Sequence, residues 1–345
     1  MAVLIIAQEQ DEHAIAVKSH LERMGNKAIV LDTGMFPESA LLAIRFQCCN
    51  RGRSIRLEVQ NQSLDLERFG SVWWRRPQPP RLSDEMVRQS HRAFAVNEIH
   101  QALSGLWQIL DAGWINEPSR DEDAQRKIYQ LRVAQEVGLR IPTTLVTNNP
   151  AEVRHFVDAR GYRDVIFKSF SSTQEEWRET RLLRDEDLKE IEHVRHAPVI
   201  FQHYVEARYD LRITAVGDKL FPAAIYSQET KYKIDSRIDI GSARIEPIEI
   251  PDEVEDKLLE LKSRLGLVFG AIDMRRAPNG DYVFLEINPS GQFMYIEATT
   301  GLPIASAVAD ELLRMDRKKS KVKTREVTSA RMPRVKTNAK TSLTI

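Results

Sequence analysis

Three oxygen-bearing side chains interrupt two apolar stretches near the end of the sequence. Glu286 and Asn288 stand two residues apart in "YVFLEINP" (282–289), and Asp273 stands in "VFGAIDMRR" (268–276). The intervening "APNGD" contains an Asn-Gly pair, which is typical of a tight turn, so the two stretches predict a β-hairpin. Because strand side chains alternate between faces, Glu286 and Asn288 should share one face, with Asp273 on the partner strand.

Two interpretations fit this convergence of polar groups. Carboxylate and amide oxygens are magnesium ligands, usually together with water and nucleotide phosphates, and a cation would offset the cost of burying them. Alternatively, the polar groups mark a strand end and meet solvent or a nearby arginine such as Arg275. Spacing alone leaves both interpretations open.

Two lysines and one mixed stretch could serve the same chemistry. Lys168 interrupts the apolar "VIFKSF", and Lys127 lies on a predicted helix after "NEP". Either lysine alone would fit an exposed side chain whose stem lies on apolar surface. The stretch "VIFQHYVE" (199–206) runs from apolar to polar residues, and such a segment can present backbone groups to an adenine ring, although by itself it is only a strand.

The elements that must position these residues follow from apolar periodicity. The N-terminal part predicts a βαβ unit with strands at 2–7 and 27–32 around a helix at 12–25, and no G-x-G-x-x-G motif follows its first strand. Further predicted elements are strands at 54–59, 71–77, 164–170 and within 198–228, and helices at 91–110, 121–138, 150–161 and 252–266.

Composition limits the class of protein. The chain has 345 residues, 42% hydrophobic and 29% charged, which favours a globular protein of several domains over a disordered one. No run of 18 apolar residues occurs and no signal peptide is recognisable, so we expect a cytoplasmic protein with no membrane partner. The cysteines, Cys48 and Cys49, are adjacent and should be reduced thiols, and the histidines show no ligand spacing.

The C-terminal segment 314–345 is strongly basic. It holds eleven Lys or Arg against two acids, a charge of +9, so residues 1–313 carry −9 in a chain of zero net charge. Its composition predicts a disordered tail. Such a tail can be a solubilising end or an arm for an acidic partner, and without interleaved aromatics we do not expect nucleic acid to be that partner.

The order of these motifs resembles the ATP-grasp superfamily of carboxylate-amine ligases over residues 1 to about 313, most specifically through "GAIDMRR" and "VFLEINPSGQF". The stretches "VWWRRPQPP", "INEPSRDEDAQRKIYQLRVAQEVGLRIPTTLVT" and "IDSRIDIG" are similar to the microviridin-type peptide ligases, the graspetide macrocyclases. Ligases of the type that adds glutamate to a ribosomal protein are the next relatives. The resemblance implies an α/β ATP-grasp fold, in which central and C-terminal α+β subdomains clasp ATP behind an N-terminal Rossmann-like (pre-ATP-grasp) domain.

On this resemblance we expect an N-terminal domain at 1–120, a central subdomain at 121–200, a C-terminal subdomain at 201–313 and the tail at 314–345. The resemblance also assigns roles to residues. The expected nucleotide-binding residues are Lys127 and Lys168 at the phosphates, Gln202, His203, Tyr204 and Val205 at the adenine, and Glu206 or Asp210 at the ribose. Asp273, Glu286 and Asn288 would hold two magnesium ions, and Arg237, with Arg212 as a second arginine, would meet the transferred phosphoryl group.

Two features depart from the superfamily pattern. The expected phosphate loop, "KSFSSTQEEWRET" (168–180), contains no glycine, and Ser236 stands in "DSR" where peptide ligases commonly have an aromatic residue.

Arg75 and Arg76 in "WWRRPQPP" could bind carboxylates at the mouth of the cleft, or the stretch could be core aromatics with arginines that cap an acidic surface.

The sequence thus predicts an ATP- and magnesium-dependent ligase that activates Asp or Glu side chains of a peptide as acyl phosphates and joins them to Ser, Thr or Lys side chains. Its expected partner is an acidic precursor peptide or an acidic protein tail, and the resemblance adds pairing as a homodimer. The alternatives are a ligase that adds an amino acid to a protein or small-molecule carboxylate, and a nucleotide-binding regulatory protein.

Overall fold

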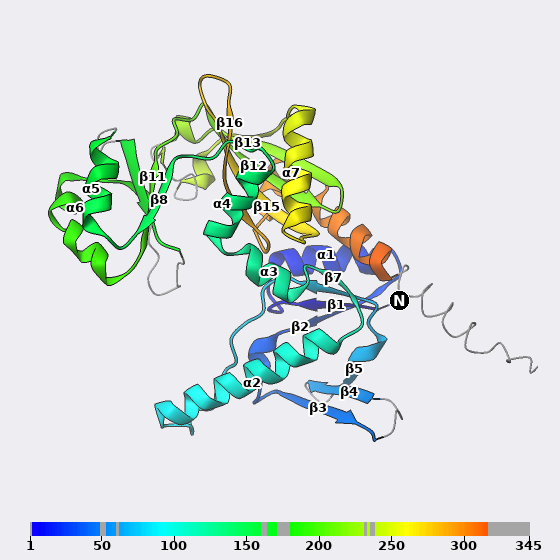
Figure 1. The fold of residues 1–345 in the computed structure, drawn as a ribbon. Coiled ribbons are helices and arrows are strands. Elements are labelled where there is room, and N and C mark those ends of the chain that lie inside the picture. Colours follow the sequence, from blue (N-terminus) through cyan, green and yellow to red (C-terminus); the bar gives the residue numbers. More distant parts are fainter. Residues whose placement is uncertain are drawn as a thin grey trace, which may run out of the picture.

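The chain folds into an N-terminal domain, a central subdomain and a C-terminal subdomain, each built on sheets of its own (Figure 1). The structure is a computed structural model, and it describes residues 2–48, 53–59, 62–159, 164–170, 180–230, 233–234 and 239–316. The predicted α/β class is confirmed.

A parallel sheet of order β2-β1-β6-β7 forms the centre of the N-terminal domain. Its strands are β1 (Ala2–Ile6), β2 (Lys27–Leu31), β6 (Ser71–Trp74) and β7 (Gly113–Ile115). Helix α1 (Glu12–Arg23) links β1 to β2, and the side chain of Asp11 caps its first turn by accepting from the Ala14 N–H at 2.8 Å. The predicted βαβ opening is therefore confirmed.

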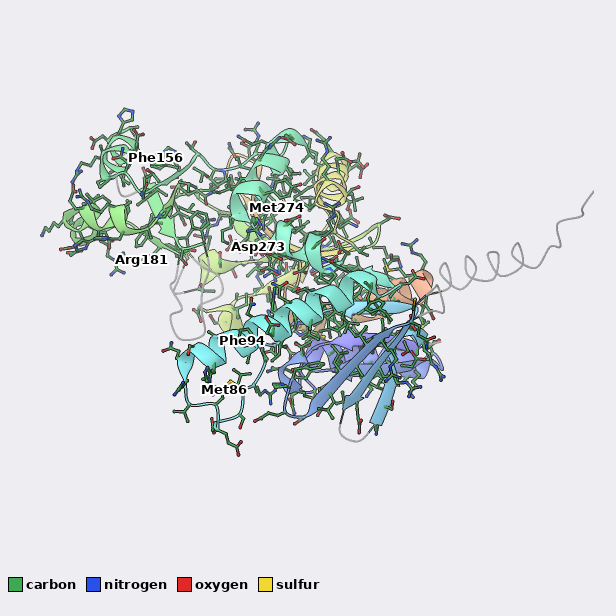
Figure 2. The ribbon with its side chains drawn as sticks, turned by 60° about the horizontal axis from the view of Figure 1, so that its bottom comes forward. Met86, Phe94, Phe156, Arg181, Asp273 and Met274 are labelled. Atoms are coloured by element: carbon green, nitrogen blue, oxygen red, sulfur yellow. The ribbon has the colours of Figure 1, made fainter. Side chains whose placement is uncertain are left out.

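A second sheet, the antiparallel meander β3-β4-β5, follows β2. It consists of β3 (Ala40–Phe46), β4 (Arg53–Val59) and β5 (Gln62–Asp65). The strand β3 was not predicted, because its side chains are mostly exposed and its sequence lacks a clear two-residue period. The long helix α2 (Gln89–Ile109) packs only its C-terminal part against the domain, and Phe94 on its outer part is 67% exposed (Figure 2).

The helix predicted at 121–138 is two helices. Helix α3 (Pro118–Ala124) ends before Gln125, and helix α4 (Lys127–Glu136) begins after Arg126. Glu117 caps α3 through its side chain, with Pro118 in the first turn. The break matters for the site, because it places Lys127 at the first position of α4.

The central subdomain is an antiparallel sheet of order β10-β9-β11-β8 covered by helices, with a small core of its own. Its elements are β8 (Thr144–Thr147), α5 (Pro150–Asp158), β9 (Val165–Lys168), β10 (Arg181–Leu182), α6 (Asp185–Lys189) and β11 (Val199–His203). Phe156 and Arg181 both lie in this subdomain, which stands to one side of the rest of the molecule (Figure 2).

The C-terminal subdomain contains an antiparallel sheet of order β14-β13-β12-β15-β16. Its elements are β12 (Tyr209–Val216), β13 (Lys219–Ile225), β14 (Ile245–Pro247), α7 (Asp252–Arg264), β15 (Phe269–Arg276), β16 (Tyr282–Asn288) and α8 (Met294–Thr300). Strands β15 and β16 form the predicted hairpin, and Gly280 in its turn has φ of 93°, a conformation that glycine adopts without strain.

A last helix covers residues 304–316, so the first three residues of the segment expected as a basic tail are helical. The rest of that segment lies outside the described residues.

One hydrophobic core joins the N-terminal domain to the C-terminal subdomain. It includes Val3 and Trp73 from the parallel sheet, Phe269 from β15, and Phe293 and Leu312 from the C-terminal segments. None of the helices in the described ranges is both long and apolar enough to span a membrane.

Candidate active site

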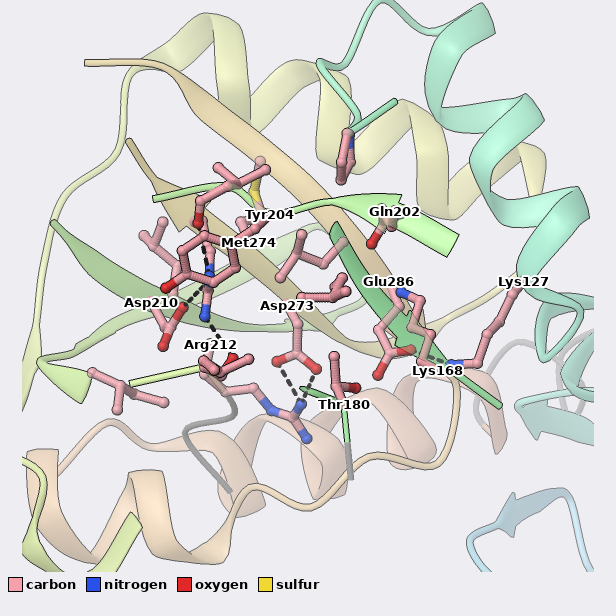
Figure 3. Close-up of a pocket in the computed structure, with 18 of the residues that line it drawn as sticks. Lys127, Lys168, Thr180, Gln202, Tyr204, Asp210, Arg212, Asp273, Met274 and Glu286 are labelled. Atoms are coloured by element: carbon pink, nitrogen blue, oxygen red, sulfur yellow. Dashed lines mark hydrogen bonds and ion pairs between the residues drawn. The ribbon is translucent and has the colours of Figure 1, made fainter. Parts of the chain in front are cut away.

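The two predicted metal-binding carboxylates are cross-strand neighbours. Asp273 on β15 pairs in register with Glu286 on β16, and the register shifts just after this pair, between Asp273 and Met274. Figure 3 shows both side chains among those that line one pocket. Asn288 lies two residues beyond Glu286 and is exposed, with its side-chain oxygen accepting from the Ser290 N–H at 2.9 Å.

A basic side chain contacts each of these two carboxylates. Arg212 on β12 donates to both carboxylate oxygens of Asp273, at 2.7 and 2.9 Å, and the ammonium group of Lys127 forms an ion pair with Glu286. Burial disfavours the charge on Arg212, but the adjacent Asp273 carboxylate outweighs burial and raises the pKa of the guanidinium. Arg212 is therefore a fixed positive charge beside Asp273.

This donor set fits a hard cation that also binds phosphate oxygens. Within the described ranges, no three His, Cys, Asp or Glu side chains lie close enough together to hold a metal by themselves. Magnesium often takes only one or two carboxylates and completes its shell with water and substrate phosphates. Asp273 and Glu286 provide such a pair.

The carboxylates lie in a pocket between the central sheet and the C-terminal sheet (Figure 3). The predicted site residues that line it are Lys127, Lys168, Gln202, His203, Tyr204, Val205, Asp210, Arg212, Asp273 and Glu286. Apolar side chains, including Ile166, Met274 and Leu285, line the same pocket. A flat apolar ring and a charged triphosphate could therefore be accommodated side by side.

The end of β11 offers backbone groups to this pocket. The Tyr204 N–H donates to the Asp164 carbonyl at 2.7 Å, and the Val205 carbonyl accepts from Arg275 at 2.7 Å. Gln202 is buried, and its side chain donates to the Thr144 hydroxyl at 2.8 Å. We therefore expect the Tyr204 carbonyl and the Val205 N–H, rather than Gln202, to meet an adenine edge.

The two ribose candidates differ in their surroundings. Asp210 is buried and accepts from Arg275 at 2.8 Å, whereas Glu206 is exposed and does not line the pocket. Asp210 is thus engaged within the fold, and Glu206 faces solvent.

Arg275 is a residue of the site whose importance the sequence analysis missed. It is 5% exposed, and besides Asp210 and the Val205 carbonyl it donates to the Ile234 carbonyl at 2.7 Å. Its guanidinium lies 5.0 Å from the centre of the Tyr204 ring. One buried cation thus joins the end of β11, the start of β12 and the segment that leads toward Arg237.

A signal for this role is present in the sequence. Both "YDLRI" and "AIDMRR" contain Asp-x-Arg, and the two strands run antiparallel. The register pairs Asp210 with Arg275 and Arg212 with Asp273. Two antiparallel copies of Asp-x-Arg place each acid opposite an arginine on one face of the sheet.

Arg75 was expected at the mouth of the cleft if it binds carboxylates. The structure places it elsewhere. Its side chain is 1% exposed and donates to the Ser290 carbonyl and, at 3.2 Å, to the Gly291 carbonyl. Burial, more than any neighbour, lowers the pKa of Arg75 to about 10. Arg75 therefore cannot meet a carboxylate from solvent in this arrangement, because it is enclosed between the domains.

The neighbours of Arg75 support the packing interpretation of "WWRR". Trp73 is buried in the shared core, and the Trp74 ring packs edge-on against Trp107 and Trp114 at centroid distances of 5.7 and 6.3 Å. Arg76 is half-buried and does not line the pocket.

Two expected features fall on residues that the structure does not describe. Arg237 lies outside the described residues, as do residues 171–179 of the expected phosphate loop. Both described ends of that loop, Lys168 to Phe170 and Thr180, line the pocket.

Known families match both parts of the chain. A family model described as the RimK-like ATP-grasp domain matches residues 124–312, and one described as the MvdD pre-ATP grasp domain matches residues 2–122. The chain belongs to the RimK-like ATP-grasp family. The ATP-grasp superfamily and the ligase class predicted from the sequence are thereby confirmed at the level of the family.

Solved structures of peptide-bound ATP-grasp proteins are similar over nearly the whole chain. The macrocyclase MdnC bound with precursor peptide MdnA, from Microcystis aeruginosa MRC, has a TM-score of 0.82 and 32% identity, covering 91% of this chain and 100% of that one. An ATP-grasp ligase associated with ribosomally made peptides (RiPPs) in Chryseobacterium gregarium, in complex with ADP and a leader and core peptide, has a TM-score of 0.81 and 28% identity, covering 91% and 96%.

Curated ATP-grasp ligases are more distant. The ribosomal protein bS6–L-glutamate ligase of Escherichia coli O81 (strain ED1a) is 25% identical over 205 residues, which are 58% of this chain and 67% of that protein. The chain spans 66%, 62% and 46% of the length of three other curated relatives.

Proposed function

We propose that this ATP-grasp protein activates Asp or Glu side chains of a peptide as acyl phosphates and joins them to Ser, Thr or Lys side chains of the same peptide. One observation carries the ligase part of the proposal. The cross-strand pair Asp273 and Glu286 shares a pocket with Lys127, Lys168 and the backbone at the end of β11. That pocket combines two carboxylates for a cation, two lysines for phosphate oxygens and apolar side chains for an adenine ring.

The reaction explains why the pocket carries both signs of charge. A substrate carboxylate oxygen attacks the γ-phosphorus of ATP, a new O–P bond forms, and the bond to the β,γ-bridging oxygen breaks to release ADP. Both reactants are anions, so the attack needs positive charge at the meeting point. Magnesium, when bound, screens the phosphates and polarises them.

The residues of the chain have separable tasks in this step. Asp273 and Glu286 would hold the cation, and Lys127 and Lys168 would bind phosphate oxygens from α4 and β9. Arg212 is the fixed cation next to Asp273, and its bidentate contact orients that carboxylate before any ligand arrives. Arg237 remains the proposed partner of the acyl phosphate.

The second step joins the activated group to its acceptor. A hydroxyl or amine attacks the acyl carbon, the C–O bond to phosphate breaks, phosphate leaves and the acceptor loses its proton. Each ester or amide link thus removes one water from the peptide overall. Support for a peptide as substrate comes from the whole-length likeness to neighbours that were solved with precursor or core peptides.

Mass spectrometry separates the candidate functions. The protein is incubated with ATP, Mg²⁺ and a short acidic peptide that contains Thr or Lys and is encoded beside this gene. Crosslinking lowers the peptide mass by one water per link. Addition of a free amino acid, the activity in the name of the E. coli relative, would raise the mass when glutamate is supplied. Nucleotide binding with no product of either kind would favour a regulatory protein and contradict the proposal.

A further inference from the structure

Several buried side chains from elsewhere in the chain bind the end of β16 and the residues that follow it. We call residues 287–294, "INPSGQFM", the exit segment. The amide of Gln130 on α4 bonds both the N–H and the carbonyl of Ile287, at 3.0 and 2.8 Å, and Asn116 donates to the Pro289 carbonyl at 2.9 Å. Both side chains are buried, so neither bond competes with water.

His13 of the N-terminal domain caps the helix that begins at the end of this segment. Phe293 is the N-cap residue of α8, and its own side chain offers no acceptor. The His13 Nε2 instead accepts from the N–H groups of Phe293 and Met294, at 3.0 and 3.3 Å, across 280 residues of sequence. Free N–H groups at a helix start normally find an acceptor nearby in the chain.

This contact fixes the state of the His13 ring. Because Nε2 accepts, the ring is neutral and carries its hydrogen on Nδ1, which faces Asp11 at 3.6 Å and Glu12 at 3.8 Å. The side chain is 2% exposed and packs edge-on against the Phe293 ring, with centroids 4.7 Å apart. A neutral buried imidazole is thus a structural acceptor here.

Arg75 of the same domain grips the exit segment just before this cap. It donates to the carbonyls of Ser290 and Gly291, and its Nε lies 3.6 Å from Asp11. The backbone at Gly291 passes very close to the sheet, since a Cβ atom there would lie 2.3 Å from the Ala271 Cβ. The segment is thus pressed between Arg75 on one side and β15 on the other.

Gln292 lies between the residues that Arg75 and His13 contact, and it connects them to the carboxylate of Asp273. Its carbonyl accepts from Arg212 at 2.9 Å, and the same guanidinium holds Asp273. Displacement of the Gln292 carbonyl would remove one of the bonds that fix Arg212, and with it the orientation of Asp273. The N-terminal domain therefore reaches the Asp273 side of the hairpin through the backbone of the exit segment.

We propose that Arg75 and His13 are positioning residues that fix the exit segment and thereby orient Arg212 and Asp273 for the nucleotide-bound cation. The inference rests on the proposed function, because it assumes that Asp273 binds that cation. It predicts that loss of the Arg75 contacts or of the His13 contacts weakens the magnesium-dependent part of nucleotide binding. Nucleotide binding without metal should be unchanged.

The test measures the affinity of the full-length protein for the non-hydrolysable analogue AMPPNP by calorimetry, with Mg²⁺ and with EDTA. We expect Arg75→Met and His13→Leu each to reduce the gain in affinity from Mg²⁺ by about tenfold, the size expected for one buried hydrogen bond. Lys262→Met is the matched control, because it removes a buried side-chain bond, to the Gly217 carbonyl, away from the exit segment.

A wild-type protein with no gain from Mg²⁺ would contradict the proposed cation site itself. A normal gain in wild type that persists in Arg75→Met and His13→Leu would overturn the positioning role alone. The two failures are therefore distinguishable.

A pair of conservative variants keeps the inference testable if His13→Leu does not fold. The glutamine oxygen in His13→Gln reaches the position of Nε2, whereas the asparagine oxygen in His13→Asn stops at the position of Nδ1. We expect His13→Gln to retain the gain from Mg²⁺ and His13→Asn to lose it. Hydrogen exchange of the Phe293 and Met294 amides should follow the same order, and identical values for the two variants would overturn the inference.

Discussion

The Nη1 atom of Arg212 donates to both carboxylate oxygens of Asp273, at 2.7 and 2.9 Å, and both residues line the pocket. The pair spans neighbouring strands, β12 and β15, and both residues occur in an Asp-x-Arg sequence. It prepares a carboxylate in one orientation before ligands arrive, which reduces the reorganisation needed when a cation binds.

Asp273→Asn and Glu286→Gln should each abolish most turnover while the protein stays folded. The amides keep the size of the side chains but remove the charges that we propose hold the cation. ADP release with the cognate peptide should fall by about 10² to 10³, as for other losses of transition-state charge stabilisation.

Asp281→Asn is the matched control for these variants, because Asp281 lies next to the same hairpin turn and pairs with Arg140 outside the pocket lining. Near-normal ADP release by Asp273→Asn would rule out a metal role for that residue.

Arg212→Met should lower both activity and the free energy of unfolding. Asp273 would lose its bonds to Arg212 in a half-buried site, at a cost of about 1–3 kcal/mol. Arg212→Lys should recover only part of this, because Nη1 contacts Asp273 while Nη2 donates to the Gln292 carbonyl, and a single ammonium nitrogen cannot replace both contacts. Urea denaturation measures the difference, and equal stability of the Lys variant and the wild type would show that the second contact of the guanidinium contributes nothing.

Asp210 and Arg275 should show strong coupling in a double-mutant cycle. Their side chains are 10% and 6% exposed, so removal of one leaves a buried, unpaired charge at a cost of about 3–5 kcal/mol. Asp210→Asn combined with Arg275→Met should cost less than the sum of the single changes, by about 0.5–3 kcal/mol.

Arg275→Met should in addition weaken AMPPNP binding, because the Val205 carbonyl would lose its fixed donor. Strict additivity of the unfolding energies would mean that the two residues act independently.

The stability of the protein should fall as the pH drops below about 6.5 in a manner that depends on His13. Burial lowers the pKa of His13, with the nearby Asp11 carboxylate opposing it, and Glu12 and Arg75 are the other charged groups that face the ring. The unfolded chain therefore binds more protons than the folded one below the ordinary histidine pKa, so acid favours unfolding.

The matched variant for this effect is His13→Gln, which keeps an acceptor but does not titrate. Unfolding free energies from urea denaturation at about pH 7.5 and about pH 5.5 should fall more in wild type than in His13→Gln. The same decrease in both proteins would place the acid sensitivity elsewhere.

Gly291→Ala should disturb the site more than its small size suggests. The added methyl group would meet the Ala271 Cβ at 2.3 Å and the Arg212 guanidinium at 3.0 Å, so the backbone or Arg212 must move. We expect a loss of stability of about 1–3 kcal/mol from this overpacking, together with loss of turnover.

Gly105→Ala is the control, because nothing lies within 4 Å of its new methyl group on α2. That change should stabilise the helix by about 0.5–1 kcal/mol. Normal turnover of Gly291→Ala would show that the close approach to β15 is not needed for activity.

Much of the ATP-binding half could be predicted from the sequence because it depends on local patterns. The hairpin followed from apolar runs around an Asn-Gly turn, and the alternation of strand side chains placed Asp273 beside Glu286. The motif order then supplied the family. Lys127 was predicted to lie on a helix and to bind phosphate, and the structure pairs it with Glu286; its helix begins at residue 127 and not at residue 121 as predicted.

The contacts that could not be predicted join residues far apart in the chain. The sequence around Arg75 is compatible with an exposed guanidinium that binds carboxylates. Only the structure shows that Arg75 is buried between domains and donates to carbonyls of the exit segment. His13 offered no motif, because a single imidazole that accepts from backbone N–H groups has no characteristic spacing. Strand β3 was missed since most of its side chains face solvent and leave no clear apolar period.

The shared core also indicates whether the N-terminal domain and the rest of the chain could fold as separate fragments. Sequence patterns suggest a boundary near residue 120, yet Val3, Trp73, Phe293 and Leu312 belong to one cluster of buried side chains. A fragment cut at that boundary would expose apolar surface on both halves and leave the start of α8 without its acceptor. The N-terminal domain is therefore a folding partner of the catalytic half, and substitutions in its buried face should destabilise both.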